Sequence, residues 1–370
     1  VNETGDFDFY HKVLPFADQG EGTVFEHLRR ALEFNLQRKG RRGLPCGLAA
    51  DWNDCLRLGY YGESMFVAFQ LRLGLTVYAG IAERLENFED SRWALNEREK
   101  LDGSIQACAW DGEWFIWAIG EDGTVYGTRD AAEGQVYLNT QLWAVISGAA
   151  TPEQAARCMQ TVHERLATPY GLMLSAPPFV RTPIDVMRAV VFNPGVKENA
   201  GIFNHTQGWG VMADCLLGEG DRAYRTYRAS MPAAYNDRAE IRQMEPYVQG
   251  QTTYSTYSPR AGNARTSWLT GAAAWASISC CCFLANFSAS WASLSCCAAA
   301  FFAASAVLST ALTAPCSTTW PWPTACTSPA SGPPGSPGPT PWLASWARWP
   351  VSERQRPPSW PVAPSCRSTT

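Results

Sequence analysis

The residue composition changes abruptly near Ala276, and this change limits how much of the chain can form a folded domain. From Ala276 to Thr370 there is no Asp, Lys, His or Tyr, yet eight of the thirteen cysteines and fourteen of the twenty-five prolines lie there. Proline removes a backbone donor and fixes φ, so a run such as SGPPGSPGPTPW cannot continue a helix or a central strand. We therefore expect a folded part over residues 1–275 and a separate, aberrant tail over residues 276–370.

Several explanations of this tail are open. We favour a shifted reading frame, because a GC-rich gene misread by one base yields Ala, Pro, Ser, Cys, Trp and Arg. Disorder is the alternative, although a disordered linker is normally polar and charged. The segment Cys280–Leu308 is long and apolar enough for a transmembrane helix, but serines and Asn286 interrupt it and no Lys/Arg asymmetry flanks it. Contiguous cysteines also lack the spacing of a disulfide framework. We assign no function to the tail.

Helical signals dominate the part before the tail, so the predicted fold class is mainly α. Thr23 is a candidate N-cap, and Thr151-Pro152-Glu153-Gln154 combines an N-cap, Pro at N1 and a capping box. Apolar periodicity and turn signals predict helices over Thr23–Gly40, Glu63–Leu85, Thr151–Leu166, Thr206–Leu217 and Asp221–Met231. Short strands are expected only in stretches such as Gly123–Tyr126 and Ala189–Phe192.

Charge and cysteine usage exclude several classes of function. A formal net charge of −4 gives no electrostatic reason to expect nucleic acid or a membrane surface as a partner. The sequence has no GxSxG, Walker or GxGxxG motif. The cysteines before the tail show no zinc-ligand spacing, which predicts no metal site and fits reduced thiols in a cytoplasmic protein: they are Cys46, Cys55, Cys108, Cys158 and Cys215.

The segment Gly43–Gly59, GLPCGLAADWNDCLRLG, carries the clearest chemical signal. It places Asp51 and Asp54 on either side of Trp52 and Asn53. An indole can stack on a sugar ring while a carboxylic acid protonates the glycosidic oxygen. Asp and Asn at such positions commonly form turns and helix caps, so on this tetrapeptide alone the structural interpretation is favoured over the catalytic one.

Gly43–Gly59 resembles the general-acid loop of the cellobiose and chitobiose phosphorylases, formerly glycosyltransferase family 36. Three further segments follow in the order of that family: Gly195–Trp209, Met244–Arg265 and Thr266–Gly271. The resemblance implies part of an (α/α)6 barrel, truncated at its N-terminal side, which in full-length members follows a β-sandwich domain. It starts in mid-family and Val1 is not methionine, so we expect that an N-terminal part is missing. The arginines that bind phosphate and the non-reducing sugar would lie in that part, and this chain alone is then expected to be inactive.

The resemblance also implies roles for individual residues. Asp54 matches the general acid, which needs a raised pKa to be protonated at neutral pH. His205, Thr270 and Gly271 match groups that bind phosphate. Glu198 matches an acceptor for the hydroxyls of the leaving sugar, while Trp52 and Asp51 are candidate substrate contacts. Inorganic phosphate is the implied co-substrate, with no metal and no organic cofactor, and the family suggests a homodimer.

Three functions are compatible with the sequence, and we favour the first. The first is inverting phosphorolysis of a β-linked disaccharide, cellobiose or N,N'-diacetylchitobiose, to α-sugar-1-phosphate and free sugar. The second is an α/α-barrel glycoside hydrolase that activates water with a second carboxylate, for which Glu198 is a candidate. The third is an inactive carbohydrate-binding fragment. Phosphate dependence of cleavage distinguishes the first from the second, and sugar binding without turnover indicates the third.

Overall fold

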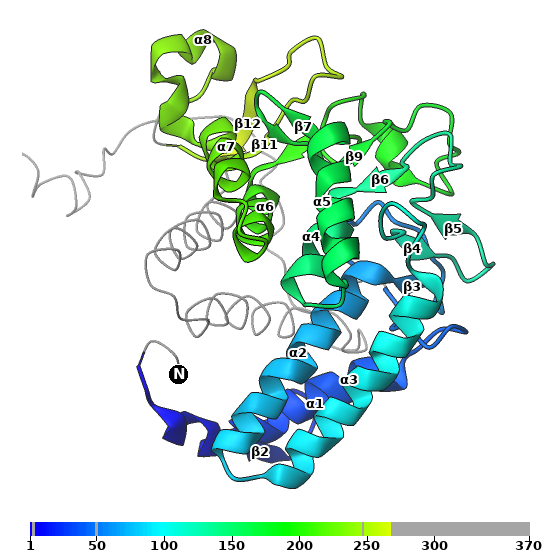
Figure 1. The fold of residues 1–370 in the computed structure, drawn as a ribbon, viewed down its shortest axis with the longest axis vertical. Coiled ribbons are helices and arrows are strands. Elements are labelled where there is room, and N and C mark those ends of the chain that lie inside the picture. The colour runs from blue at the N-terminus through cyan, green and yellow to red at the C-terminus, as the bar shows by residue number, and fades with distance from the viewer. Residues whose placement is uncertain (2–3, 49–50, 246–247, 268–370) are drawn as a thin grey trace, which may run out of the picture. The chain divides into compact units, whose positions relative to one another are not determined.

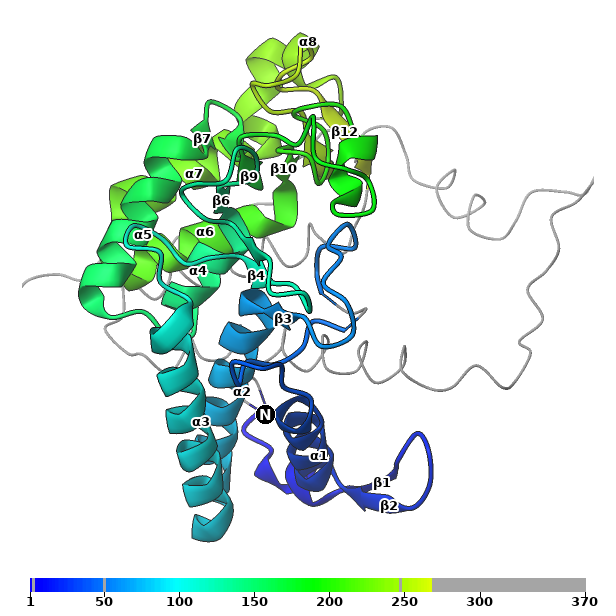
Figure 2. The ribbon, with the colours of Figure 1, turned by 90° about the vertical axis from the view of Figure 1, so that its right-hand side faces the viewer.

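The computed structural model describes residues 1, 4–48, 51–245 and 248–267, all within one unit of the chain, Val1–Pro315 (Figures 1 and 2). Thr270, Gly271 and the predicted tail lie outside the described residues. The α-helices in the described part are α1 Val24–Gln37, α2 Met65–Arg84, α3 Phe88–Cys108, α4 Leu138–Ile146, α5 Pro152–Arg165, α6 Asn204–Leu216, α7 Gly220–Ser230 and α8 Ala239–Arg242. Three 3-10 helices accompany them: η1 Phe7–His11, η2 Arg188–Val191 and η3 Pro232–Arg238.

Strands are short and form small antiparallel sheets. They are β1 Val13–Pro15, β2 Glu21–Thr23, β3 Glu63–Ser64, β4 Ala118–Ile119, β5 Val125–Tyr126, β6 Val136–Tyr137, β7 Ala167–Thr168, β8 Gly171–Leu172, β9 Ser175–Ala176, β10 Ile202–Phe203, β11 Gly250–Thr253 and β12 Ala264–Ser267. In the described residues β3-β4-β5 and β10-β11-β12 form three-stranded sheets, and β1-β2, β6-β9 and β7-β8 form pairs. The protein is therefore mainly α, as predicted.

The longer helices are organised as successive hairpins. The pairs α2–α3, α4–α5 and α6–α7 are in contact, and α4 also contacts both α2 and α6 (Figure 1). Each of the helices α2, α4 and α6 begins immediately after a two-residue strand, namely β3, β6 and β10. A repeated helical hairpin with one helix of each pair packed against the next is the layout expected for an α/α toroid. Closure into a barrel stays a prediction.

Local capping explains why most predicted helices form where they do. Thr23 and Thr151 both make complete capping boxes, with Glu26 and Gln154 respectively, at the starts of α1 and α5. Ser64 caps α2 by accepting a hydrogen bond from the Val67 N–H. The predicted helices are confirmed to within a few residues, whereas α3 and α4 were not predicted. In α3 only Ser91, Ala94, Leu101 and Ile105 are buried, so the apolar pattern is weak.

Both predicted strands needed correction. Residues 189–192 are not a strand: η2 occupies Arg188–Val191, and the Phe192 N–H bonds back to the Ala189 carbonyl. β-branched residues indicated a strand there, but the chain turns on itself instead of pairing with a neighbour. In the other segment only Val125–Tyr126 is a strand, because Gly123 has φ 92° in the turn that precedes it.

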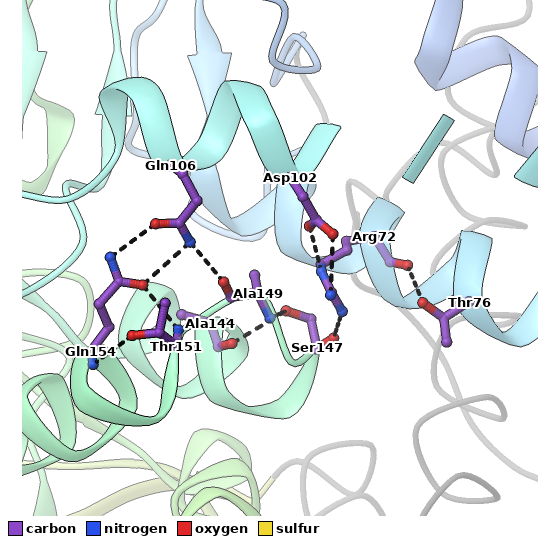
Figure 3. A network of polar contacts seen from close by, with 9 residues as sticks. All are labelled: Arg72, Thr76, Asp102, Gln106, Ala144, Ser147, Ala149, Thr151 and Gln154. Atoms are coloured by element: carbon purple, nitrogen blue, oxygen red, sulfur yellow. Dashed lines mark hydrogen bonds and ion pairs between the residues drawn. The ribbon is translucent and has the colours of Figure 1, made fainter. Parts of the chain in front are cut away.

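Tertiary contacts tie the hairpins together. The largest side chains with under 2% exposure in the described core include Trp114, Trp143, Trp209, Phe69 and Met65. At the α2–α3–α4 contact, Arg72 on α2 bonds Asp102 on α3 and the Ser147 carbonyl just after α4 (Figure 3). Figure 3 also shows Gln106 on α3 joining the Ala149 carbonyl and Gln154 at the start of α5. Polar contacts of this kind fix the helices relative to each other.

By length and apolar composition α2 also suits a membrane span. Its ten buried residues, however, pack in the core together with residues of α1, α3 and α4. We interpret α2 as the core helix of a hairpin.

Candidate active site

The loop from Gly43 to Gly59 is held against the start of α2. Cys46 forms an isolated antiparallel β-bridge with Glu63 on β3. The Gly47 N–H donates a hydrogen bond to the Gly62 carbonyl at 2.9 Å. A Cβ on Gly62 would lie 2.3 Å from the carbonyl oxygen of Leu58, so only glycine allows the loop to return this closely. The loop therefore ends at a defined point of the helical framework.

Three consecutive side chains of this loop bind the N-terminal ends of three different helices. Asp51 Oδ2 accepts a hydrogen bond from Ser64 Oγ, the cap of α2, at 2.5 Å. Trp52 Nε1 donates to His205 Nε2 in the first turn of α6 at 2.6 Å. Asn53 Nδ2 donates to the hydroxyl of Tyr137, which precedes α4, at 3.0 Å. The loop thus joins the starts of α2, α6 and α4, and Asp54 is the next residue along the chain.

Trp52 is half-buried and lies among aromatic rings. Its ring centroid is 4.9 Å from Phe203, 5.2 Å from His205 and 6.4 Å from Trp209, each in an edge-on arrangement. It also contacts both apolar clusters of the described residues. Trp52 therefore has the packing of a core indole, and its predicted sugar contact would use the part of the ring that stays accessible.

His205 occupies the first turn of α6, and the backbone N–H groups at the start of a helix favour anions. Its ring centroid is 5.1 Å from Trp209, edge-on. Burial lowers the pKa of His205 to about 4. The imidazole is consequently neutral near pH 7, and it can offer one N–H donor and one acceptor nitrogen.

Glu198 lies in a strained loop between β9 and β10. Its neighbours Lys197 and Ala200 have φ of 49° and 60°, a region that non-glycine residues seldom adopt. Asn199 is fully buried and clamps this loop: its Oδ1 accepts from the Phe179 N–H at 2.7 Å, and its Nδ2 donates to the carbonyls of Phe179 and Phe192, both at 2.8 Å. The strained backbone around Glu198 is held in place by these three bonds.

Asp54, in the loop from Gly43 to Gly59, and Glu198, in the loop before β10, interact electrostatically. Burial raises the pKa of Glu198, and the charge of Asp54 raises it further, against the effect of Lys197. Glu198 Oε2 is buried and has no hydrogen-bond partner among the described residues. Burial likewise raises the pKa of Asp51, opposed by its hydrogen bonds with Ser64 and Asn53. The structure thus brings Asp51, Asp54 and Glu198 into one region.

Asp54 itself is exposed. The described residues therefore do not bury this carboxylate, and burial is one of the two ways, beside a neighbouring negative charge, in which a protein raises the pKa of a general acid. Asp54 would lose its contact with water only if a ligand bound over Trp52 also covered Asp54. Its role stays a prediction.

The segment that leads to Thr270 and Gly271 begins beside His205. β10, which ends at Phe203, pairs with β11, and β11 pairs with β12 so that Gly250 lies opposite Ser267. Asn204 Nδ2, next to His205, donates to the Gly250 carbonyl at 2.7 Å. The sheet therefore places the end of β12 near the start of α6, three residues before Thr270.

Cysteines and metal ligands form no further site in the described ranges. All five described cysteines are free thiols, and burial raises the pKa of Cys55, next to Asp54, to about 12. Within residues 1–267, apart from the few that are not described, no three His, Cys, Asp or Glu side chains gather as metal ligands. An open pocket of about 350 Å³, lined by Trp117, Tyr126, Glu133, Phe179 and Arg181 among others, contains none of the predicted site residues.

Sequence reasoning missed Tyr137 and Asn199 and saw Asn53 only as a turn or cap residue. No local sequence pattern identifies Tyr137, because its role depends on a hydrogen bond with Asn53, which lies 84 residues away along the chain. Asn199 follows Glu198 directly, and a buried amide beside a strained loop is recognised only once the three carbonyl and N–H partners are in place. Asn53 does form the expected turn, since its N–H bonds Asp51 and its Oδ1 accepts from the Cys55 N–H.

The loop of the candidate acid, the half-buried indole of Trp52 and the start of α6 thus lie together in the fold. The chain matches the Glycosyl hydrolase 94 superfamily, catalytic domain, over residues 1–284, and it belongs to this family. The family resemblance inferred from the four sequence segments is confirmed.

Individual relatives are similar over the same stretch. The chain is 38% identical over 282 residues to an N,N'-diacetylchitobiose phosphorylase from Vibrio furnissii, which covers 75% of this chain and 35% of that protein. It is 33% identical over 279 residues to a solabiose phosphorylase from Paenibacillus borealis, covering 74% and 36%. The chain therefore spans about a third of the length of these relatives. A solved family GH78 rhamnosidase of Bacillus sp. GL1 aligns with a TM-score of 0.45 at 16% identity, covering 68% of this chain and 23% of that one, and this value does not establish a shared fold.

Proposed function

We propose that this chain provides the acid and part of the phosphate site of an enzyme that cleaves a β-linked disaccharide by phosphorolysis. Asp54 donates a proton to the oxygen of the leaving sugar, and Glu198 contacts the hydroxyls of that sugar. His205, together with Thr270 and Gly271, binds inorganic phosphate, which attacks the anomeric carbon from the opposite face. The product is an α-sugar-1-phosphate, with inversion of configuration.

One observation carries this proposal: the hydrogen bond between Trp52 and His205. It joins the loop of the candidate acid to the helix start at which an anion would bind, although 153 residues separate the two in sequence. Acid and nucleophile must lie on either side of one glycosidic bond, so such a connection supports a shared site. Family membership and relatives named as disaccharide phosphorylases support the same reaction.

The hydrolase alternative would use Glu198 as the base that activates water. Burial raises the pKa of Glu198, and a carboxylate with a raised pKa can act as a base as well as contact sugar hydroxyls. Phosphate is already an anionic nucleophile and requires no base. Phosphate dependence of cleavage therefore distinguishes phosphorolysis from hydrolysis.

The substrate, partners and surroundings belong to the same proposal. We favour N,N'-diacetylchitobiose as the first disaccharide to test and cellobiose as the second, since two relatives at 38% identity are named for the former. The reaction calls for phosphate as co-substrate and for no metal or organic cofactor. We further propose a cytoplasmic homodimer that binds neither nucleic acid nor a membrane.

A chimera tests the reaction directly. Residues 1–284 would replace the matching stretch of the Vibrio furnissii relative, so that the remaining parts of a complete enzyme are present. We expect sugar-1-phosphate to form only with phosphate and the disaccharide together. Free sugars released without phosphate would instead indicate the hydrolase.

Replacing the candidate acid provides the matched control. In the chimera, Asp54→Asn is expected to lower turnover by at least about 100-fold, the usual scale for a general acid. Asp54 is exposed and has no side-chain hydrogen bond within the described part, so the melting temperature should not change. Near-normal turnover in Asp54→Asn would reject this residue as the acid.

A further inference from the structure

We infer that Trp52 is a positioning residue: its indole N–H holds His205 as the neutral Nδ1–H tautomer and so presents one fixed donor to a bound anion. This inference rests on the proposed function for the identity of the anion, which is phosphate. It concerns the proton on His205, and this can be observed without turnover.

The chemistry of the two rings determines the tautomer. An indole N–H can only donate, so Nε2 of His205, 2.6 Å from Trp52 Nε1, must be the acceptor. An imidazole that accepts at Nε2 and is neutral carries its proton at Nδ1. In an unconstrained histidine the Nε2–H tautomer predominates, so this arrangement has to be imposed by the surroundings.

The surroundings of His205 leave Nδ1 available. Phe203 and Trp209 lie edge-on at 6.2 and 5.1 Å between ring centroids, so the ring is enclosed by aromatic groups. Among the described residues no hydrogen bond uses Nδ1. The ring also sits in the first turn of α6, where backbone N–H groups favour a negative charge. A single N–H donor directed at an anion there forms a charge-assisted hydrogen bond.

This assignment has a consequence for Trp52. Its one polar hydrogen is used by His205, so it cannot bind a sugar hydroxyl. Any contact between Trp52 and the disaccharide is then made by the ring alone. Removing the N–H while keeping an aromatic ring should therefore affect phosphate more than sugar.

The test uses the complete 370-residue chain with isotope-labelled histidine. Only four histidines occur, and the His205 signals are identified by their loss in His205→Asn. Ring 15N and 13C chemical shifts at neutral pH should show an unprotonated Nε2 and a protonated Nδ1. In Trp52→Phe, with an unchanged far-UV circular dichroism spectrum, the signals should move to the Nε2–H form. Titration with inorganic phosphate should shift the Nδ1 signal in the unsubstituted chain, with affinity about tenfold weaker in Trp52→Phe for the loss of one positioned hydrogen bond.

Trp114→Phe is the matched control. It removes an indole N–H bond of the same kind, from Trp114 to the Gly127 carbonyl at 2.9 Å, outside the candidate site. The His205 tautomer should not change in this variant. His205→Asn, whose amide N–H replaces Nδ1–H, should retain more phosphate affinity than His205→Gln, whose amide N–H replaces Nε2–H.

The possible outcomes separate the two proposals. An Nε2–H tautomer in the unsubstituted chain overturns the inference, whether or not Trp52→Phe folds. A tautomer that is the same in Trp52→Phe also overturns it. If Nδ1–H is found and depends on Trp52 but phosphate has no effect, the positioning role stands and the proposed phosphate site fails.

Discussion

Replacing Asn199 should strongly destabilise the chain, although Asn199 is not a candidate for contact with substrate. Asn199→Ala removes three hydrogen bonds of 2.7, 2.8 and 2.8 Å from a side chain with 0% exposure. Each such bond contributes about 1 kcal/mol net, and a buried N–H or carbonyl left without a partner costs about 1–3 kcal/mol. We therefore expect a loss of about 3–5 kcal/mol, a large share of the roughly 5–15 kcal/mol typical of a domain.

Urea denaturation, followed by far-UV circular dichroism and tryptophan fluorescence, measures this loss. Asn35→Ala is the matched control, because Asn35 Nδ2 makes only one hydrogen bond, to the Ala31 carbonyl within α1. Alanine is also the better helix former, so the free energy of unfolding should change by less than about 1 kcal/mol in the control. Asn199→Asp should be as damaging as Asn199→Ala, since a carboxylate would face the carbonyls of Phe179 and Phe192 without a donor.

The reasoning fails if Asn199→Ala lowers the free energy of unfolding by less than about 1 kcal/mol with an unchanged urea dependence. In that case the loop around Glu198 would be held by other contacts. In the chimera, the same substitution should also reduce turnover, because Glu198 lies between two residues with positive φ that the clamp keeps in place.

Three further substitutions test other contacts. Glu198→Gln should raise the melting temperature at pH 8 and much less at pH 4.5. Burial raises the pKa of Glu198 in the folded chain, so the stability associated with its protonated form is lost as the pH rises through this folded-state pKa. Ser64→Ala should cost about 1–2 kcal/mol in urea, because it removes the cap of α2 and the 2.5 Å bond to Asp51. Asp214→Asn should cost about 3–5 kcal/mol by the same assay, since this fully buried carboxylate pairs with His163 and Arg222.

Each of these expectations has a contradicting result. Equal melting temperatures of Glu198→Gln and the unsubstituted chain at both pH values would mean that Glu198 is solvated. An unchanged urea midpoint for Ser64→Ala would show that neither of its bonds contributes to stability. A stable Asp214→Asn would mean that the ion pairs only balance the cost of burying the charge.

Interactions between residues that are close in sequence made most of the helices predictable. The capping boxes at Thr23 and Thr151 and the apolar periodicity of α2 depend on residues within one or two turns of helix, so the sequence alone located these helices. The chemistry of Gly43–Gly59 was equally visible, since its acids and indole are contiguous. The strand predicted over Ala189–Phe192 was wrong because β-propensity needs a neighbouring strand to act upon.

Only the tertiary structure decided which groups meet. Asp51, Trp52 and Asn53 read locally as a turn, yet each binds the start of a different helix, 13, 153 and 84 residues away. The neutral state of His205, the raised pKa of Glu198 and the clamp by Asn199 all follow from burial by these distant segments. The sequence determined which chemical groups and helices are present, and the packing of helical hairpins determined their mutual positions and protonation, because desolvation and long-range hydrogen bonds exist only in the folded chain.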